Sequence, residues 1–253
     1  MKRFINKFVF FSILIYLCPN GSYASPNFCI IGDNTTDCSL NHLDITSLST
    51  GIINTGNILG DVNGEWAGIY HDGLAPNADP INGITNFGTI TGVVNGIGIW
   101  GSAVISGGIT NKNGATISGY AGILTESTAT INFINNAGSI LGFNLNSLAP
   151  ATDVFIGIEN YGTIGEIINT GTIAPTRNLN VSYGIINNGT ITTLNNAQGA
   201  GNANGALTYN GALPANYNII INSPTSYGKL LVTNGTGSTN FGIYNGSTVV
   251  ICC

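Results

Sequence analysis

One short unit recurs along this chain and limits the folds that it can adopt. The unit places isoleucine, asparagine, glycine and isoleucine at alternate positions, and residues 158–173, IENYGTIGEIINTGTI, hold two copies in succession. The other copies and the doubled pair are centred on Asn54, Asn86, Asn136, Asn160, Asn169 and Asn187, and a looser copy spans Ile109–Ile117. Repetition of a short unit along a chain is typical of solenoids, in which each repeat stacks on the next.

The residue types in the unit favour strands joined by corners. β-Branched isoleucine prefers extended backbone and packs well on a pleated surface. Asparagine and glycine both tolerate positive φ, so the Asn-x-Gly step supplies a corner between two short strands. A helix is disfavoured, because each glycine costs about 1 kcal/mol relative to alanine in a helix. We therefore predict an all-β solenoid, with isoleucines stacked inside and asparagines stacked at corners in a hydrogen-bonded ladder.

The spacing of the copies varies along the chain. The intervals are 32 residues from Asn54 to Asn86, 24 from Asn136 to Asn160, 9 from Asn160 to Asn169 and 18 from Asn169 to Asn187. We predict rungs of about 18–27 residues with loops inserted at corners, and about six to eight rungs in residues 45–197. The nine-residue interval then separates two neighbouring corners of one coil.

The N-terminus has the pattern of a secretory signal peptide in residues 1–24. Basic residues in the first seven positions precede the apolar run FVFFSILIYLC, which is too short to span a membrane, and Ala24 ends a small-residue cleavage pattern. A lipoprotein signal at Cys18 is the less favoured alternative, since bulky Leu17 precedes it. We expect export through the inner membrane, and then the cell surface or the extracellular space if a translocator is available, otherwise the periplasm.

Removal of residues 1–24 leaves a strongly acidic chain. Three basic residues remain, Lys112, Arg177 and Lys229, against all eleven acidic ones, which gives a net charge of −8. Three scattered cations cannot neutralise a phosphate backbone or hold an anionic membrane, so we predict no nucleic-acid partner and no electrostatic membrane binding.

The regions on either side of the predicted coils differ from them. Residues 25–44 contain Cys29 and Cys38, which we expect to form a disulfide in an oxidising compartment, with two free thiols as the alternative. We interpret this segment as an N-terminal cap. Residues 197–206 are rich in Gly, Asn and Ala, and residues 198–253 are predicted as a further β segment. The sequence does not assign a state to Cys252 and Cys253.

These features together resemble the passenger domains of bacterial type V autotransporters. The resemblance rests on the signal peptide, the GI-x-N-x-G-T-I units, the low charge and the stretch LTYNGALPANYNIIINSPTSYGKLLVTNGTGSTNFGIYNGSTV. It implies a right-handed parallel β-helix that is exported as a surface or released passenger. Such proteins end in an outer-membrane β-barrel translocator, which residues 1–253 do not contain. Because STVVICC looks interrupted, we expect a truncated chain; a separate translocator and retention in the periplasm are the alternatives.

The densest group of ionisable residues lies between the first two units. It comprises Asp61, Glu65, His71, Asp72 and Asp79. Paired carboxylates suit glycoside cleavage, and histidine with aspartate suits a metal, but a solvated loop is the favoured interpretation. Trp66 and Tyr70 beside the acids suit sugar stacking, although packing of the loop onto the coil is favoured.

The sequence gives little support to two kinds of enzyme site, a dinucleotide-binding site and a serine hydrolase site. Residues 96–101, GIGIWG, match the dinucleotide pattern G-x-G-x-x-G, but β-like sequence follows where a helix is needed, so we predict a glycine-rich corner. No G-x-S-x-G accompanies His42 or His71 for a serine hydrolase.

We therefore predict a non-enzymatic secreted or surface-exposed solenoid with a structural or adhesive role, without metal or cofactor. Its partners are expected to be glycans or proteins of the host or environment. The alternatives are a carbohydrate-active β-helix enzyme that uses Asp61, Glu65 and Asp72, and a non-functional gene fragment.

Overall fold

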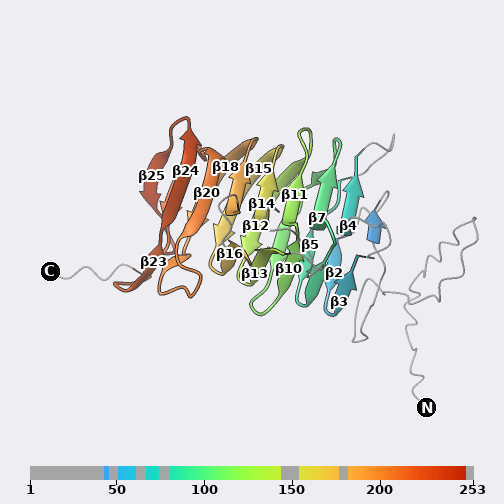
Figure 1. The fold of residues 1–253 in the computed structure, drawn as a ribbon, viewed down its shortest axis with the longest axis horizontal. Helices are drawn as coiled ribbons and strands as arrows, with labels where there is room; N and C mark the ends of the chain where they lie inside the picture. The colour runs from blue at the N-terminus through green and yellow to red at the C-terminus, as the bar shows by residue number, and fades with distance from the viewer. Residues whose placement is uncertain are drawn as a thin grey trace, which may run out of the picture.

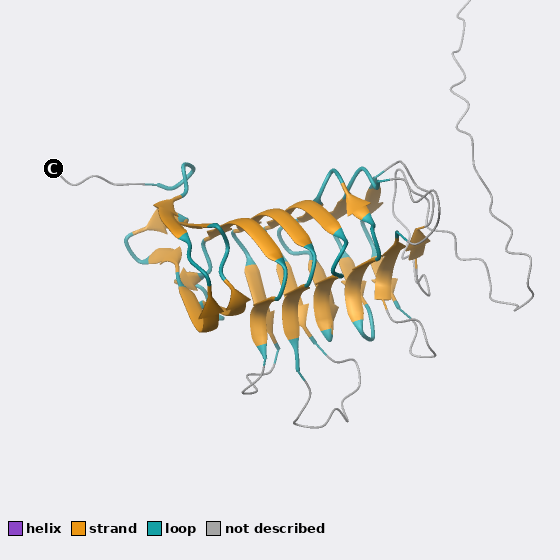
Figure 2. Cartoon of the chain, turned by 90° about the horizontal axis from the view of Figure 1, so that it is seen from above, coloured by secondary structure: helices purple, strands orange, loops and turns teal. Residues whose placement is uncertain are grey.

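The chain folds as a β-solenoid of about six turns, with no helix in the part that is described (Figures 1 and 2). The structure is a computed structural model, and it describes residues 43–45, 51–60, 67–73, 80–143, 154–176 and 182–248. For residues 43–45 and Asp72 it describes the backbone alone. The prediction of an all-β chain of stacked parallel coils is confirmed. The predicted signal peptide, the Cys29–Cys38 disulfide and nearly all of the predicted cap lie outside the described residues.

Three parallel sheets form the sides of the solenoid. Sheet A contains β3 (Asn57–Leu59), β6 (Thr89–Thr91), β10 (Thr116–Gly119), β13 (Ser139–Gly142) and β16 (Thr172–Pro175). Sheet B contains β1 (Leu43–Ile45), β4 (Ala67–Asp72), β7 (Asn95–Trp100), β11 (Ala121–Thr125), β14 (Ile156–Asn160), β17 (Tyr183–Asn187), β20 (Leu207–Ala212) and β24 (Leu230–Thr236).

Sheet C contains β2 (Ile52–Asn54), β5 (Ile84–Asn86), β9 (Ile109–Asn111), β12 (Thr130–Asn136), β15 (Thr163–Asn169), β18 (Thr190–Asn196), β21 (Asn216–Ile219) and β25 (Asn240–Ile243), with β8 (Val104–Ile105) paired to β12. A small antiparallel sheet D contains β19 (Gly199–Ala200), β22 (Ile221–Ser223) and β23 (Ser226–Gly228). In each full turn the chain passes through sheets B, C and A in that order, and the turns follow one another along the long axis (Figure 1).

Stacked isoleucines form the core, as predicted. In sheet A the register aligns Ile58, Ile90, Ile117, Ile140 and Ile173 in one buried row. The corresponding row in sheet B passes from isoleucines to Tyr209 and Val232, and the row in sheet C passes from isoleucines through Leu194 to Tyr217 and Phe241. One rung cannot bury its apolar face alone, so the stack as a whole supplies the core.

The predicted asparagine ladder runs along the corner between sheets C and A. Each buried side chain except the last donates from Nδ2 to Oδ1 of the asparagine in the next turn, over distances of 2.8 to 3.0 Å. The ladder contains Asn54, Asn86, Asn111, Asn136, Asn169 and Asn196. These side chains satisfy one another in an interior where an unpaired amide would be costly.

A second, shorter ladder lies at the corner between sheets B and C, where Asn160 donates to Asn187 over 2.7 Å. The doubled unit therefore marks two neighbouring corners of one turn, as predicted. Stacked asparagines are 25 to 33 residues apart, so the predicted rung length of 18–27 residues includes the turns of 25 and 27 residues but not those of 32 and 33. The intervals of 24 and 18 residues compare different corners, since Asn136 stacks on Asn169 and not on Asn160.

Glycines also lie near the start of sheet B strands, next to the third corner, where the chain passes from sheet A to sheet B. A Cβ atom on Gly157 would lie 2.6 Å from Ile173 Cγ2 and 2.6 Å from the Gly184 carbonyl oxygen. Gly96 is equally confined, with Ile117 Cγ2 at 2.8 Å. In β4, β7, β11, β14 and β17, the glycine that precedes the inward isoleucine thus lets the sheet B strand lie close to the core residues of sheet A.

Sheets B and C continue beyond position 197, whereas sheet A does not. Sheet A ends at β16, and the Gln198 side chain accepts a hydrogen bond of 2.7 Å from the Ile173 backbone amide at that edge. The hairpin of β22 and β23 follows on this side, and β23 also pairs with β19. At the other end, residues 43–45 already pair with β4 as a solenoid strand.

Candidate functional site

The structure describes only part of the predicted acidic cluster. Asp61, Glu65 and Asp79 lie outside the described residues, as does Trp66, and of Asp72 only the backbone is described, at the end of β4. His71 is 1% exposed, opposite Ile99. No group of three potential metal ligands occurs within the described ranges. The catalytic candidates therefore stay predictions.

Tyr70 and the GIGIWG segment belong to neighbouring strands of sheet B. Tyr70 is half-buried, and its ring centroid lies 6.0 Å from that of Trp100. The prediction of a glycine-rich corner at GIGIWG is wrong, because Gly96–Trp100 lies within strand β7 and only Gly101, with φ of 57°, begins a turn. The alternation of glycine with inward Ile97 and Ile99 allows this segment to extend as a strand.

A depression of about 380 Å³ lies on the outer side of sheet B, across β7, β11, β14 and β17. The register places Gly98, Leu124, Glu159 and Ile186 in one outward row, which we call the floor row, and the last three of these residues line the depression. Further lining residues are Val94, Asn95, Tyr120, Ala121, Val154 and Ile156 before these floor positions, and Trp100, Tyr161 and Asn188 after them. We call this feature the sheet B depression.

Glu159 is the single charged side chain among the described residues that line the sheet B depression. Its Oε1 accepts a hydrogen bond of 2.8 Å from the Tyr161 hydroxyl. This bond, with a smaller effect of burial, raises the pKa of Tyr161 to about 12. A carboxylate has acceptor capacity for several donors, so Glu159 can receive a further hydrogen bond from a ligand.

Two buried donors beside the floor have no hydrogen-bond partner. They are Nδ2 of Asn95 and Nε1 of Trp100. Both lie around Gly98, because a Cβ atom there would be 2.8 Å from Trp100 Nε1 and 3.5 Å from Asn95 Nδ2. A buried donor without an acceptor costs about 1–3 kcal/mol, so this place favours an added oxygen atom.

Sequence reasoning missed the sheet B depression. Its floor residues come from four turns, and the variable spacing of the turns conceals their alignment. Gly98 also looks like one more glycine of the repeat. The signal that was available is the outward position directly before each corner residue, which is occupied by Gly98, Leu124 and Glu159 in successive turns.

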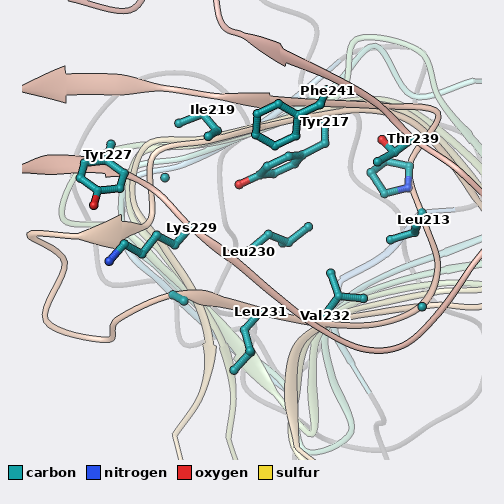
Figure 3. Close-up of a pocket in the computed structure, with 14 residues that line it drawn as sticks. Leu213, Tyr217, Ile219, Tyr227, Lys229, Leu230, Leu231, Val232, Thr239 and Phe241 are labelled. Carbon is teal, nitrogen blue, oxygen red and sulfur yellow. The ribbon is translucent and has the colours of Figure 1, made fainter.

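A second hollow, of about 860 Å³, lies at the C-terminal end of the solenoid (Figure 3). Leu230, Val232, Tyr217 and Phe241 surround it in the close-up. Phe241 is 68% exposed, because no further described strand lies on β25. The hollow is the end of the core rows of sheets B and C, and none of its described lining residues is acidic. We therefore assign it no chemistry.

Comparisons with known proteins gave no match among protein-family models, curated proteins or solved structures. In the part of the chain that the structure describes, no helix has the length and apolar character needed to cross a membrane. The function of the chain is therefore inferred from its own fold and surface.

Proposed function

We propose that this chain is a non-enzymatic structural solenoid with an adhesive role, which contacts glycans or proteins through the outer side of sheet B. The sheet B depression carries the proposal. It combines aromatic rims, provided by Trp100, Tyr120 and Tyr161, with a small number of polar groups, as ligand sites commonly do. Its floor is held by paired strands of a stacked core, so the surface is rigid before a ligand arrives.

Export is part of the same proposal. The N-terminal signal pattern and the autotransporter-like units support delivery through the inner membrane, with the solenoid as a passenger at the surface or outside the cell. The test is a fusion of residues 1–24 to a phosphatase that folds only in the periplasm. Phosphatase activity supports export, and its absence, with the fusion protein retained in the cytoplasm, contradicts export.

Adhesion is tested with the purified protein on surfaces coated with glycans, glycoproteins or unglycosylated proteins. We expect saturable binding that falls at least about tenfold in Tyr161→Ala, which removes a rim ring. Phe87→Ala is the matched control, since Phe87 is a 52% exposed aromatic residue in the turn between β5 and β6, away from sheet B. Failure of the wild type to bind any coated surface contradicts the adhesive role.

The same assay separates adhesion from catalysis. Mass spectrometry of the glycans after incubation reports any cleavage. We expect unchanged glycans with the wild type and with the triple variant Asp61→Ala, Glu65→Ala, Asp72→Ala. Cleavage by the wild type that disappears in the triple variant would show that the non-enzymatic assignment is wrong.

A further inference from the structure

We infer that the sheet B depression holds one residue of a neutral glycan, with one of its oxygen atoms beside Asn95 and Trp100. This inference rests on the proposed adhesive function and specifies the ligand class of that site.

The two unpartnered donors define one end of the site. Asn95 is 2% exposed, so its Nδ2 has been withdrawn from water without gaining an acceptor. Trp100 Nε1 is also buried and faces the same place over Gly98. Trp100 is half-buried and lines the depression with its indole over Gly98, so the place for a ligand oxygen is the side of the depression next to Asn95. A hydroxyl or ring oxygen there accepts from both nitrogen atoms.

Glu159 defines the other end of the site. It lies two strands from Gly98 in the floor row, and the usual spacing between strands puts the two positions about 10 Å apart. A carboxylate accepts hydrogen bonds and donates none, so the ligand must present a donor there. An acceptor at one end and a donor at the other are both supplied by the hydroxyl groups of a sugar.

The charge and shape of the depression favour a neutral sugar over other ligands. No lysine or arginine is among its described lining residues, and Glu159 repels an anion, so phosphates and acidic sugars are disfavoured. Leu124 lies on the floor between the two polar ends, and aromatic rings border it. A pyranose has this same division, with an apolar C–H face and polar edges.

The experiment uses the fluorescence of Trp100. The chain has two tryptophans, so Trp66→Phe leaves Trp100 as the sole indole. This protein is titrated with neutral hexose oligosaccharides, with an oligosaccharide containing uronic acid, and with an uncharged peptide. Gly98→Ala places a methyl group between the two donors, and Glu159→Gln removes the charged acceptor. Phe87→Ala is the control, and far-UV circular dichroism verifies the fold of every variant.

We expect a saturable change in Trp100 emission with a neutral oligosaccharide. Affinity falls at least about tenfold in Gly98→Ala and in Glu159→Gln, and is unchanged in Phe87→Ala. Tighter binding of the acidic oligosaccharide or of the peptide overturns the ligand class. Unaltered affinity in correctly folded Gly98→Ala overturns the location.

The adhesion assay separates this inference from the proposed function. If no oligosaccharide changes Trp100 emission while the protein still binds coated surfaces, the neutral-glycan site is wrong and the adhesive role stands. If the protein binds neither oligosaccharides nor surfaces, both are wrong.

Discussion

Replacing Asn136 with alanine tests whether the asparagine ladder stabilises the solenoid. The Asn136 side chain is fully buried and makes three hydrogen bonds. Its Nδ2 donates to Asn169 Oδ1 over 2.9 Å and to the Thr172 carbonyl oxygen over 3.0 Å, and its Oδ1 accepts from Asn111 Nδ2 over 2.9 Å. At about 1 kcal/mol for each net hydrogen bond, Asn136→Ala lowers the free energy of unfolding by about 3 kcal/mol.

Urea unfolding, followed by far-UV circular dichroism, measures this loss. With an m-value of about 2 kcal/mol/M, the midpoint falls by about 1.5 M. Asn132→Ala is the matched control in the same strand, because Asn132 is exposed and makes one hydrogen bond of 3.1 Å to the Ser106 carbonyl oxygen. We expect a loss of less than about 1 kcal/mol there. Equal losses in the two variants would refute a stabilising role for the ladder.

Three other predictions concern the corner, the core and the pH dependence. Gly157→Ala destabilises by about 1–3 kcal/mol through overpacking, whereas Gly242→Ala, whose close neighbour is the movable end of Asn218, costs less in the same urea assay. Ile167→Ala removes a fully buried side chain and costs about 2–5 kcal/mol, whereas neighbouring Ile168→Ala costs under about 1 kcal/mol; equal losses would contradict the inward and outward assignment. Burial raises the pKa of Tyr209 above the ordinary value of 10.0, so the folded chain keeps a proton that the unfolded chain loses. The free energy of unfolding therefore falls as the pH rises above about 10, and falls less steeply in Tyr209→Phe.

The sequence predicted the fold well because the repeat fixes the residues that face inward. Ile164 and Ile173, for example, are each buried by packing on the isoleucine of the preceding turn. Asparagine at a corner likewise needs a partner in the next turn, so the ladder followed from residue type alone. The length of every turn did not follow, because some turns carry the same unit at two corners and a one-dimensional spacing cannot tell Asn160 from Asn169.

The candidate site was harder to predict, because outward positions obey no repeat. Tyr70, Gly98, Leu124, Glu159 and Ile186 occupy equivalent places on the outside of sheet B and share no chemical property. Their alignment depends on the register of five strands, which loops of different length separate in the sequence. The members of the acidic cluster are close in the chain. Closeness in the chain, however, does not predict which outward residues of a solenoid become neighbours.

This division between inward and outward residues has a consequence for how binding can vary. Ile158 and Glu159 are adjacent in β14, yet the first lies in the core row and the second in the floor of the sheet B depression. Changing Ile158 alters a stack that every turn shares, whereas changing Glu159 alters one hydrogen bond to Tyr161 and the charge of the depression. Outward residues can therefore change the ligand with little loss of stability, while the repeat preserves the scaffold. A rigid solenoid whose outward residues can change independently of its core suits the proposed adhesive role.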